Sequence, residues 1–236
     1  MKIIALLFVL ILCSFIQNTN SNKIAFLVPE SNYDEIDLPK NAQNIEFVGL
    51  FESKTGFYAQ KTKIKIINTE NIQEDDSQKR IKVKSKDECK LVILNKKIND
   101  HPFKRVILNN DNPIDPNFNE SFDYLGKTYT VYAMGTKTNS TPNNPGYYDV
   151  SNYKLYISTV KNGKKITQLI YAVKKFEERL PSNIELAGDI DGDGLLDLYM
   201  EASGHYAGAK YVLFLSSNAT YNEVFHLVAE YQFMGC

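Results

Sequence analysis

Tryptophan is absent from the 236 residues, and cysteine and histidine occur only three times each. There is no Cys-x-x-Cys pair and no Cys/His cluster, so nothing supports a redox or zinc centre. Neither sign of charge is in excess, because 27 lysines and arginines stand against 28 acidic residues, and a nucleic-acid partner is not expected. The Walker, GxGxxG, GxSxG and HExxH patterns are also missing, which removes common motifs of nucleotide binding and hydrolysis.

Long apolar runs are missing as well. The longest run, "IIALLFVLILCSFI" at residues 3–16, is too short to cross a bilayer, which needs about 20 residues. A lysine before it and polar "QNTNSN" after it are typical of a secretory signal peptide, which we place at residues 1–21. A buried N-terminal strand or helix is the alternative. The pattern predicts an exported protein: secreted, periplasmic or at the cell surface.

The cysteines bear on the same question. Cys13 could carry a lipid anchor, but the preceding Leu-Ile-Leu lacks the small residues that such anchors need, so lipidation is disfavoured. Removal of residues 1–21 leaves Cys89 and Cys236. An even pair in an oxidising compartment predicts one disulfide, with two free thiols as the alternative.

Alternation of apolar and polar residues indicates strands with one buried face. It occurs at 61–67, 79–85, 127–134, 153–159 and 224–233. Short continuous apolar runs at 89–94 and 211–217 predict strands buried on both faces. We expect a mainly β fold of antiparallel sandwich-like or meander sheets, with at most one or two short helices. The helix candidate is 168–180, ended by Pro181, and a strand competes with it there.

The Asn- and Pro-rich stretch 109–121 reads as a loop between two regions. We therefore predict an N-terminal β region at 22–112 and a C-terminal β region at 113–236, which could equally form one domain over 22–236.

The most distinctive stretch is "DIDGDGLLD" at 189–197, with four aspartates and two glycines in nine residues. Calcium is a hard cation that takes about six to eight oxygen ligands in a flexible shell. Carboxylates at alternate positions of a tight loop can supply them, and glycine permits the sharp turn. The predicted ligands are Asp189, Asp191, Asp193, the Leu195 carbonyl and Asp197. The alternative is that Asp and Gly are simply good turn residues.

An EF-hand is excluded, because position 12 of the loop is Met200 instead of an acidic residue. The residues after the loop alternate as in a strand. Leu196, Leu198, Met200 and Ala202 would share one face, and Asp197, Tyr199 and Glu201 the other. We therefore expect an acidic hairpin loop between two strands.

This loop resembles the DxDxDGxxD calcium loop of FG-GAP repeats, found in integrin-type propellers and many exported bacterial proteins. The resemblance matches every ligand position from Asp189 to Asp197. A propeller needs several such repeats and this chain has one, so a full propeller is not expected. The last fifty or so residues also resemble small exported bacterial proteins with a single loop of this kind. The resemblance implies that the protein is exported and binds calcium, and it implies no particular catalytic activity.

Two functions remain open. In the first, the chain is a non-enzymatic scaffold, in which calcium is structural and exposed tyrosines such as Tyr147 and Tyr148 bind a protein or polysaccharide. In the second, it is a calcium-assisted secreted hydrolase that uses His205, which lies between a glycine and a tyrosine. We expect His101 to lie in a loop without a partner and His226 to be structural. The first function is favoured, since five protein ligands describe a closed structural site.

Overall fold

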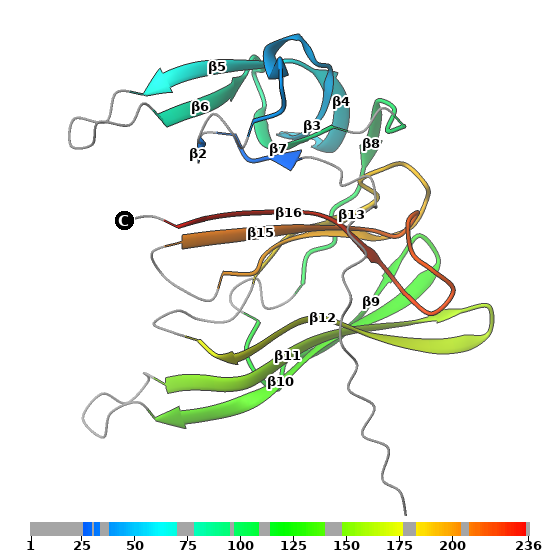
Figure 1. Ribbon diagram of the computed structural model, residues 1–236. Coiled ribbons are helices and arrows are strands. Elements are labelled where there is room, and N and C mark those ends of the chain that lie inside the picture. Colours follow the sequence, from blue (N-terminus) through cyan, green and yellow to red (C-terminus); the bar gives the residue numbers. More distant parts are fainter. Residues whose placement is uncertain are drawn as a thin grey trace, which may run out of the picture.

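The computed structural model describes residues 26–29, 31–33, 38–69, 78–94, 97–108, 114–139, 148–176, 183–203 and 208–234. These residues form antiparallel strands and one short 3₁₀ turn, η2 (Ala42–Asn44), and no α-helix. The sheets do not close into a barrel. The predicted mainly β, antiparallel fold is confirmed (Figure 1).

The residues before Lys104 form two neighbouring sheets. The larger has the order β1-β7-β3-β4-β8, and the smaller has the order β2-β6-β5. The strands of the larger sheet are β1 (Phe26–Leu27), β3 (Phe47–Ser53), β4 (Gly56–Thr62), β7 (Glu88–Ile93) and β8 (His101–Phe103). Those of the smaller are β2 (Asn32–Tyr33), β5 (Ile64–Thr69) and β6 (Gln78–Val83).

The described residues after Lys104 form two four-stranded meanders, in which strands adjacent in sequence pair with one another. The first contains β9 (Asn119–Tyr124), β10 (Lys127–Asn139), β11 (Tyr148–Lys161) and β12 (Lys164–Lys175). The second contains β13 (Asn183–Gly188), β14 (Asp197–Glu201), β15 (Gly208–Leu215) and β16 (His226–Met234).

The β13–β16 sheet is the middle layer of three. Figure 1 shows it between the five-stranded sheet and the β9–β12 sheet. Leu198 and Met200 of β14 belong to the core shared with β9–β12, whereas Tyr199 belongs to the core shared with the five-stranded sheet. The predicted division of the strand after the loop into two faces is therefore confirmed, and both faces are buried.

The apolar runs behave as predicted. Val212 and Phe214 of β15 face one core while Leu213 and Leu215 face the other. In β7, Leu91 and Ile93 face a different cluster from Val92. Alternation of apolar side chains between two cores produces the continuous apolar runs at 211–217 and 89–94.

The helix considered at 168–180 is wrong for its described part, because residues 164–175 form β12. The turn before it explains the error. Asn162 and Gly163 both have positive φ, 53° and 74°, and Lys161 pairs with Lys164 across them. Asn-Gly in a two-residue turn is the strongest short-range signal for a β-hairpin. The residues after this turn therefore pair with β11 as a strand.

Several predictions concern residues outside the described part of the chain: the signal peptide at 1–21 with Cys13, Tyr147, His205 and Cys236. The two-region division stays a prediction. Among the described residues, no helix is long and apolar enough to cross a membrane.

Candidate metal centre

The acidic loop connects β13 to β14 as a hairpin. Gly188 at the end of β13 pairs with Asp197 at the start of β14, and residues 189–196 lie between them. The predicted strand–loop–strand arrangement is confirmed. Because β13 and β14 belong to the middle layer, the loop connects two strands that are packed on both faces.

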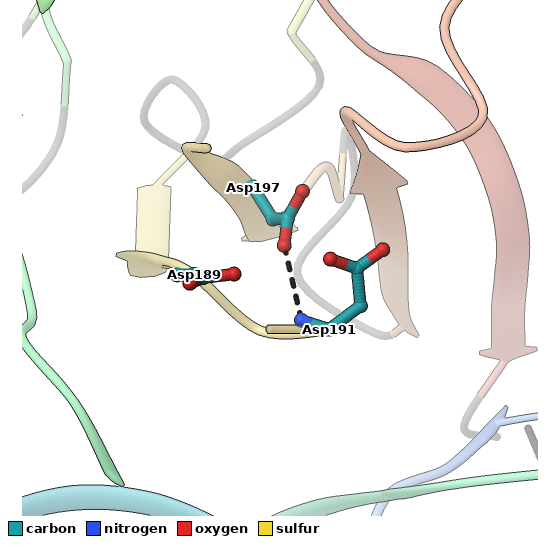
Figure 2. Close-up of side chains that lie close together, drawn as sticks. All are labelled: Asp189, Asp191 and Asp197. Atoms are coloured by element: carbon teal, nitrogen blue, oxygen red, sulfur yellow. Dashed lines mark hydrogen bonds between the residues drawn. The ribbon is translucent and has the colours of Figure 1, made fainter. Parts of the chain in front are cut away.

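Three of the four aspartates converge. One carboxylate oxygen each of Asp189, Asp191 and Asp197 lies within 4.8 Å of the others. Figure 2 shows the three side chains, from the loop and from the start of β14, around a common space. Carboxylate oxygens are hard donors of the kind that calcium and magnesium prefer.

Asp197 is fully buried and is held by the backbone. Its Oδ2 accepts hydrogen bonds from the Ile190 N–H at 2.8 Å and from the Asp191 N–H at 3.2 Å, the latter drawn in Figure 2. Its Oδ1 accepts one from the Ser216 N–H at 2.7 Å. Burial, followed by the charge of Asp191, raises the pKa of Asp197 well above its usual value, and the backbone bonds offset part of this rise. A cation near this carboxylate would favour its charged form.

Asp189 folds the loop back on itself. Its Oδ1 accepts the Gly192 N–H at 2.8 Å and its Oδ2 accepts the Gly194 N–H at 3.0 Å. Both glycines have φ of 81°, in the left-handed region that other residues rarely adopt. The two glycines in the motif thus allow the loop to surround the carboxylate at its first position.

Asp191 and Asp193 are bound by serines that follow β15. The Ser217 hydroxyl donates a hydrogen bond to Asp191 Oδ2. The Ser216 hydroxyl lies 3.1 Å from Asp193 Oδ2, and Asp193 Oδ1 accepts the Leu195 N–H at 2.8 Å. Burial raises the pKa of Asp191. Asp193 lies outside the converging group, and the Leu195 carbonyl stays a predicted ligand.

His101 and Tyr124 support the loop from its backbone side. His101 starts β8, and its ring nitrogens lie 2.8 Å from the Asn99 carbonyl oxygen and 2.9 Å from the Asp189 carbonyl oxygen. The Tyr124 hydroxyl accepts the Asp189 N–H at 2.7 Å. The expectation that His101 lies in a loop without a partner is therefore wrong. Because both ring nitrogens face backbone carbonyls, this imidazole holds the loop to the neighbouring sheet.

Ser216, Ser217, His101 and Tyr124 were not predicted for this site. They come from the segment after β15, from β8 and from β9, and only the pairing and packing of distant strands brings them to the loop. A local sequence pattern could have suggested the serines alone, since "SS" ends the predicted strand at 211–217.

Cys89 lies half-buried in β7 and forms no disulfide within the described part of the chain; its Sγ is 3.4 Å from the Leu91 carbonyl oxygen. Burial raises the pKa of this thiol to about 12, so it is protonated at neutral pH. Tyr231 of β16 packs against the same small cluster as Cys89, five residues before Cys236 in sequence. The disulfide with Cys236 stays a prediction.

Comparisons of the chain with protein-family models, with curated proteins and with solved structures found no match.

Proposed function

We propose that the loop at 189–197 binds one calcium ion and that the ion is structural. The convergence of Asp189, Asp191 and Asp197 at the tip of a hairpin carries this proposal. Three carboxylates this close repel one another, and burial disfavours the charge of Asp197 further. A divalent cation would remove both costs. The likeness of the loop to the FG-GAP calcium loop supports the choice of calcium.

We further propose an exported, non-enzymatic binding module. The apolar run at 3–16 between Lys2 and a polar stretch supports export, and extracellular fluids hold calcium at concentrations that weak sites can use. The proposed ion stabilises the hairpin in the middle layer, and therefore the scaffold that presents the outer sheets. Among the described residues beside the loop, His101 has both ring nitrogens within 2.9 Å of backbone carbonyl oxygens, which favours a structural role for this histidine.

Thermal unfolding with and without calcium tests the metal site. At about 1 mM calcium, a dissociation constant near 0.1 mM would add roughly 1.4 kcal/mol to the free energy of unfolding. For a chain of this size, that raises the Tm by about 3–6 °C. Asp191→Ala should abolish the shift, while Asp149→Asn, at an exposed position in β11, should keep it. An equal shift in Asp191→Ala would refute the site.

A further inference from the structure

The outer face of the β9–β12 sheet exposes large apolar side chains. This face points away from the middle layer (Figure 1). Val131 and Ala133 of β10 are buried toward the middle layer, so the alternate residues Tyr132 and Met134 face outward. Met134 is 56% exposed and Leu169 is 47% exposed, which leaves an apolar surface on a sheet that is otherwise polar outside.

These side chains form a continuous strip across three strands. Tyr132 pairs with Tyr156, which pairs with Leu169, and the two tyrosine rings stack with centroids 5.0 Å apart at 12°. The next row along the strands pairs Met134 with Lys154 and Lys154 with Ala172. The row on the other side of the tyrosines carries the hydroxyls of Thr130 and Thr167, with the buried Ser158 between them. Aromatic, aliphatic and hydroxyl groups therefore lie side by side.

A shallow, open hollow of about 530 Å³ adjoins the strip. Its lining includes Met134, Asn152, Lys154, Tyr156, Ala172 and Lys174. The hollow lies where the β10–β11 register shifts between Met134 and Thr136, opposite Asn152 with a φ of 52°. A bulge of this kind breaks the flat sheet surface and makes room for a ligand.

Two positively charged side chains lie in the lining of the hollow. Lys154 and Lys174 are exposed in its lining, and no ion pair is recorded for either among the described residues. The acidic residues of these four strands, Glu120 and Asp123 of β9 and Asp149 of β11, are not in the lining of the hollow. The hollow therefore favours a ligand that combines negative charge with an apolar face.

We infer that this face binds an acidic polysaccharide. The apolar face of a sugar ring would lie against Tyr156 and Met134, and a uronate carboxylate would lie near Lys154 and Lys174. Sugar hydroxyls would meet the row of Thr130 and Thr167. An isologous dimer through this face would instead bring the two lysines near their own copies, which like-charge repulsion disfavours.

The inference deepens the proposed binding role by naming its surface and partner class. The surface lies on a different sheet from the acidic loop, so the two proposals can fail separately. An Asp191→Ala chain that has lost its calcium-dependent stabilisation should still bind the oligosaccharide.

Calorimetric titration of the full chain in calcium, with short hyaluronan or galacturonate oligosaccharides as probes, tests the inference. We expect binding that weakens with added salt and no comparable binding of neutral cellodextrins. Tyr156→Ala, and separately the pair Lys154→Gln and Lys174→Gln, should each weaken binding about five- to tenfold. The matched pair Lys63→Gln and Lys65→Gln removes two exposed lysines from another part of the chain and should change nothing. Melting curves show whether each variant is folded.

Three results would overturn the inference. The first is no binding of either acidic oligosaccharide by the folded wild type. The second is equal binding of poly-L-glutamate with no effect of Tyr156→Ala, which would indicate an acidic protein partner. The third is a concentration-dependent dimer that Met134→Lys abolishes, without oligosaccharide binding, which would assign the face to self-association.

Discussion

Asp197 differs from the other aspartates of the loop in being fully buried and in accepting three backbone N–H groups. An asparagine at this position would direct its NH₂ group toward one of these donors. Asp197 therefore has a structural role even without an ion, whereas Asp191 lies partly exposed and bonds mainly to a serine.

Asp197→Asn should lower the free energy of unfolding by about 1–3 kcal/mol in calcium-free buffer, because a buried donor loses its acceptor. The free energy of unfolding of Asp191→Asn should lie within about 0.5 kcal/mol of the wild-type value in that buffer. It should fall below the wild-type value only when calcium is present. Urea unfolding of both variants gives the comparison. Similar losses in the two variants without calcium would contradict this division of roles.

Stability should depend on pH in a direction set by Asp197. An aspartate in the unfolded chain titrates near about 3.9, and burial keeps the native group protonated to higher pH. Between these two pKa values the native state binds more protons, so the free energy of unfolding of the calcium-free protein falls as pH rises. Calcium stabilisation should therefore grow with pH across this window. A Tm difference between calcium and calcium-free buffer that stays constant down to about pH 4 would refute this.

The two loop glycines make a matched pair. Both have φ of 81°, but a Cβ on Gly192 would lie 3.3 Å from His101 Cε1, whereas one on Gly194 would meet nothing within 4 Å. Gly194→Ala should cost about 1–2 kcal/mol from the left-handed backbone alone. Gly192→Ala should cost more, and urea unfolding measures both. Equal losses of unfolding free energy in the two variants would contradict this, because they would mean that the His101 ring moves aside without destabilising the fold.

At the scale of the elements, the segment after β15 supplies hydrogen-bond donors to the acidic loop. Ser217 donates to Asp191, so Ser217→Ala should weaken calcium affinity about tenfold while the calcium-free stability stays near that of wild type. Ser121→Ala, which removes an exposed hydroxyl from β9, is the control. Calcium titration followed by tyrosine fluorescence measures the affinity. An unchanged affinity in Ser217→Ala would place Asp191 outside the ligand set.

The strands could be predicted because burial of one face forces alternation and burial of both faces produces apolar runs. The helix candidate failed because the spacing of Leu169, Ile170 and Val173 fits either structure, and the Asn162–Gly163 turn decided between them. The hairpin around the acidic loop could be predicted from local residues. The contacts of His101 and Tyr124 could not, because they depend on which sheets pack together.

At the scale of the molecule, the β13–β16 sheet packs against another sheet on each face, and neighbouring residues of β15 belong to different cores. Leu213→Ala and Phe214→Ala should each cost about 2–5 kcal/mol, because each leaves a cavity. Both should shift one shared unfolding transition, since the middle layer belongs to both cores. Near-UV and far-UV circular dichroism test this, with the exposed Leu169→Ala as control. Two separate transitions would show that the layers unfold independently.

Calorimetric titration with calcium is the most direct test of the central claim, that the loop at 189–197 holds an ion. The account predicts one calcium per chain, with a dissociation constant on the order of 10⁻⁴–10⁻³ M, as in extracellular calcium modules. Binding should be lost in Asp191→Ala and kept in Asp149→Asn. No binding by the folded wild type, or undiminished binding by Asp191→Ala, would contradict the account.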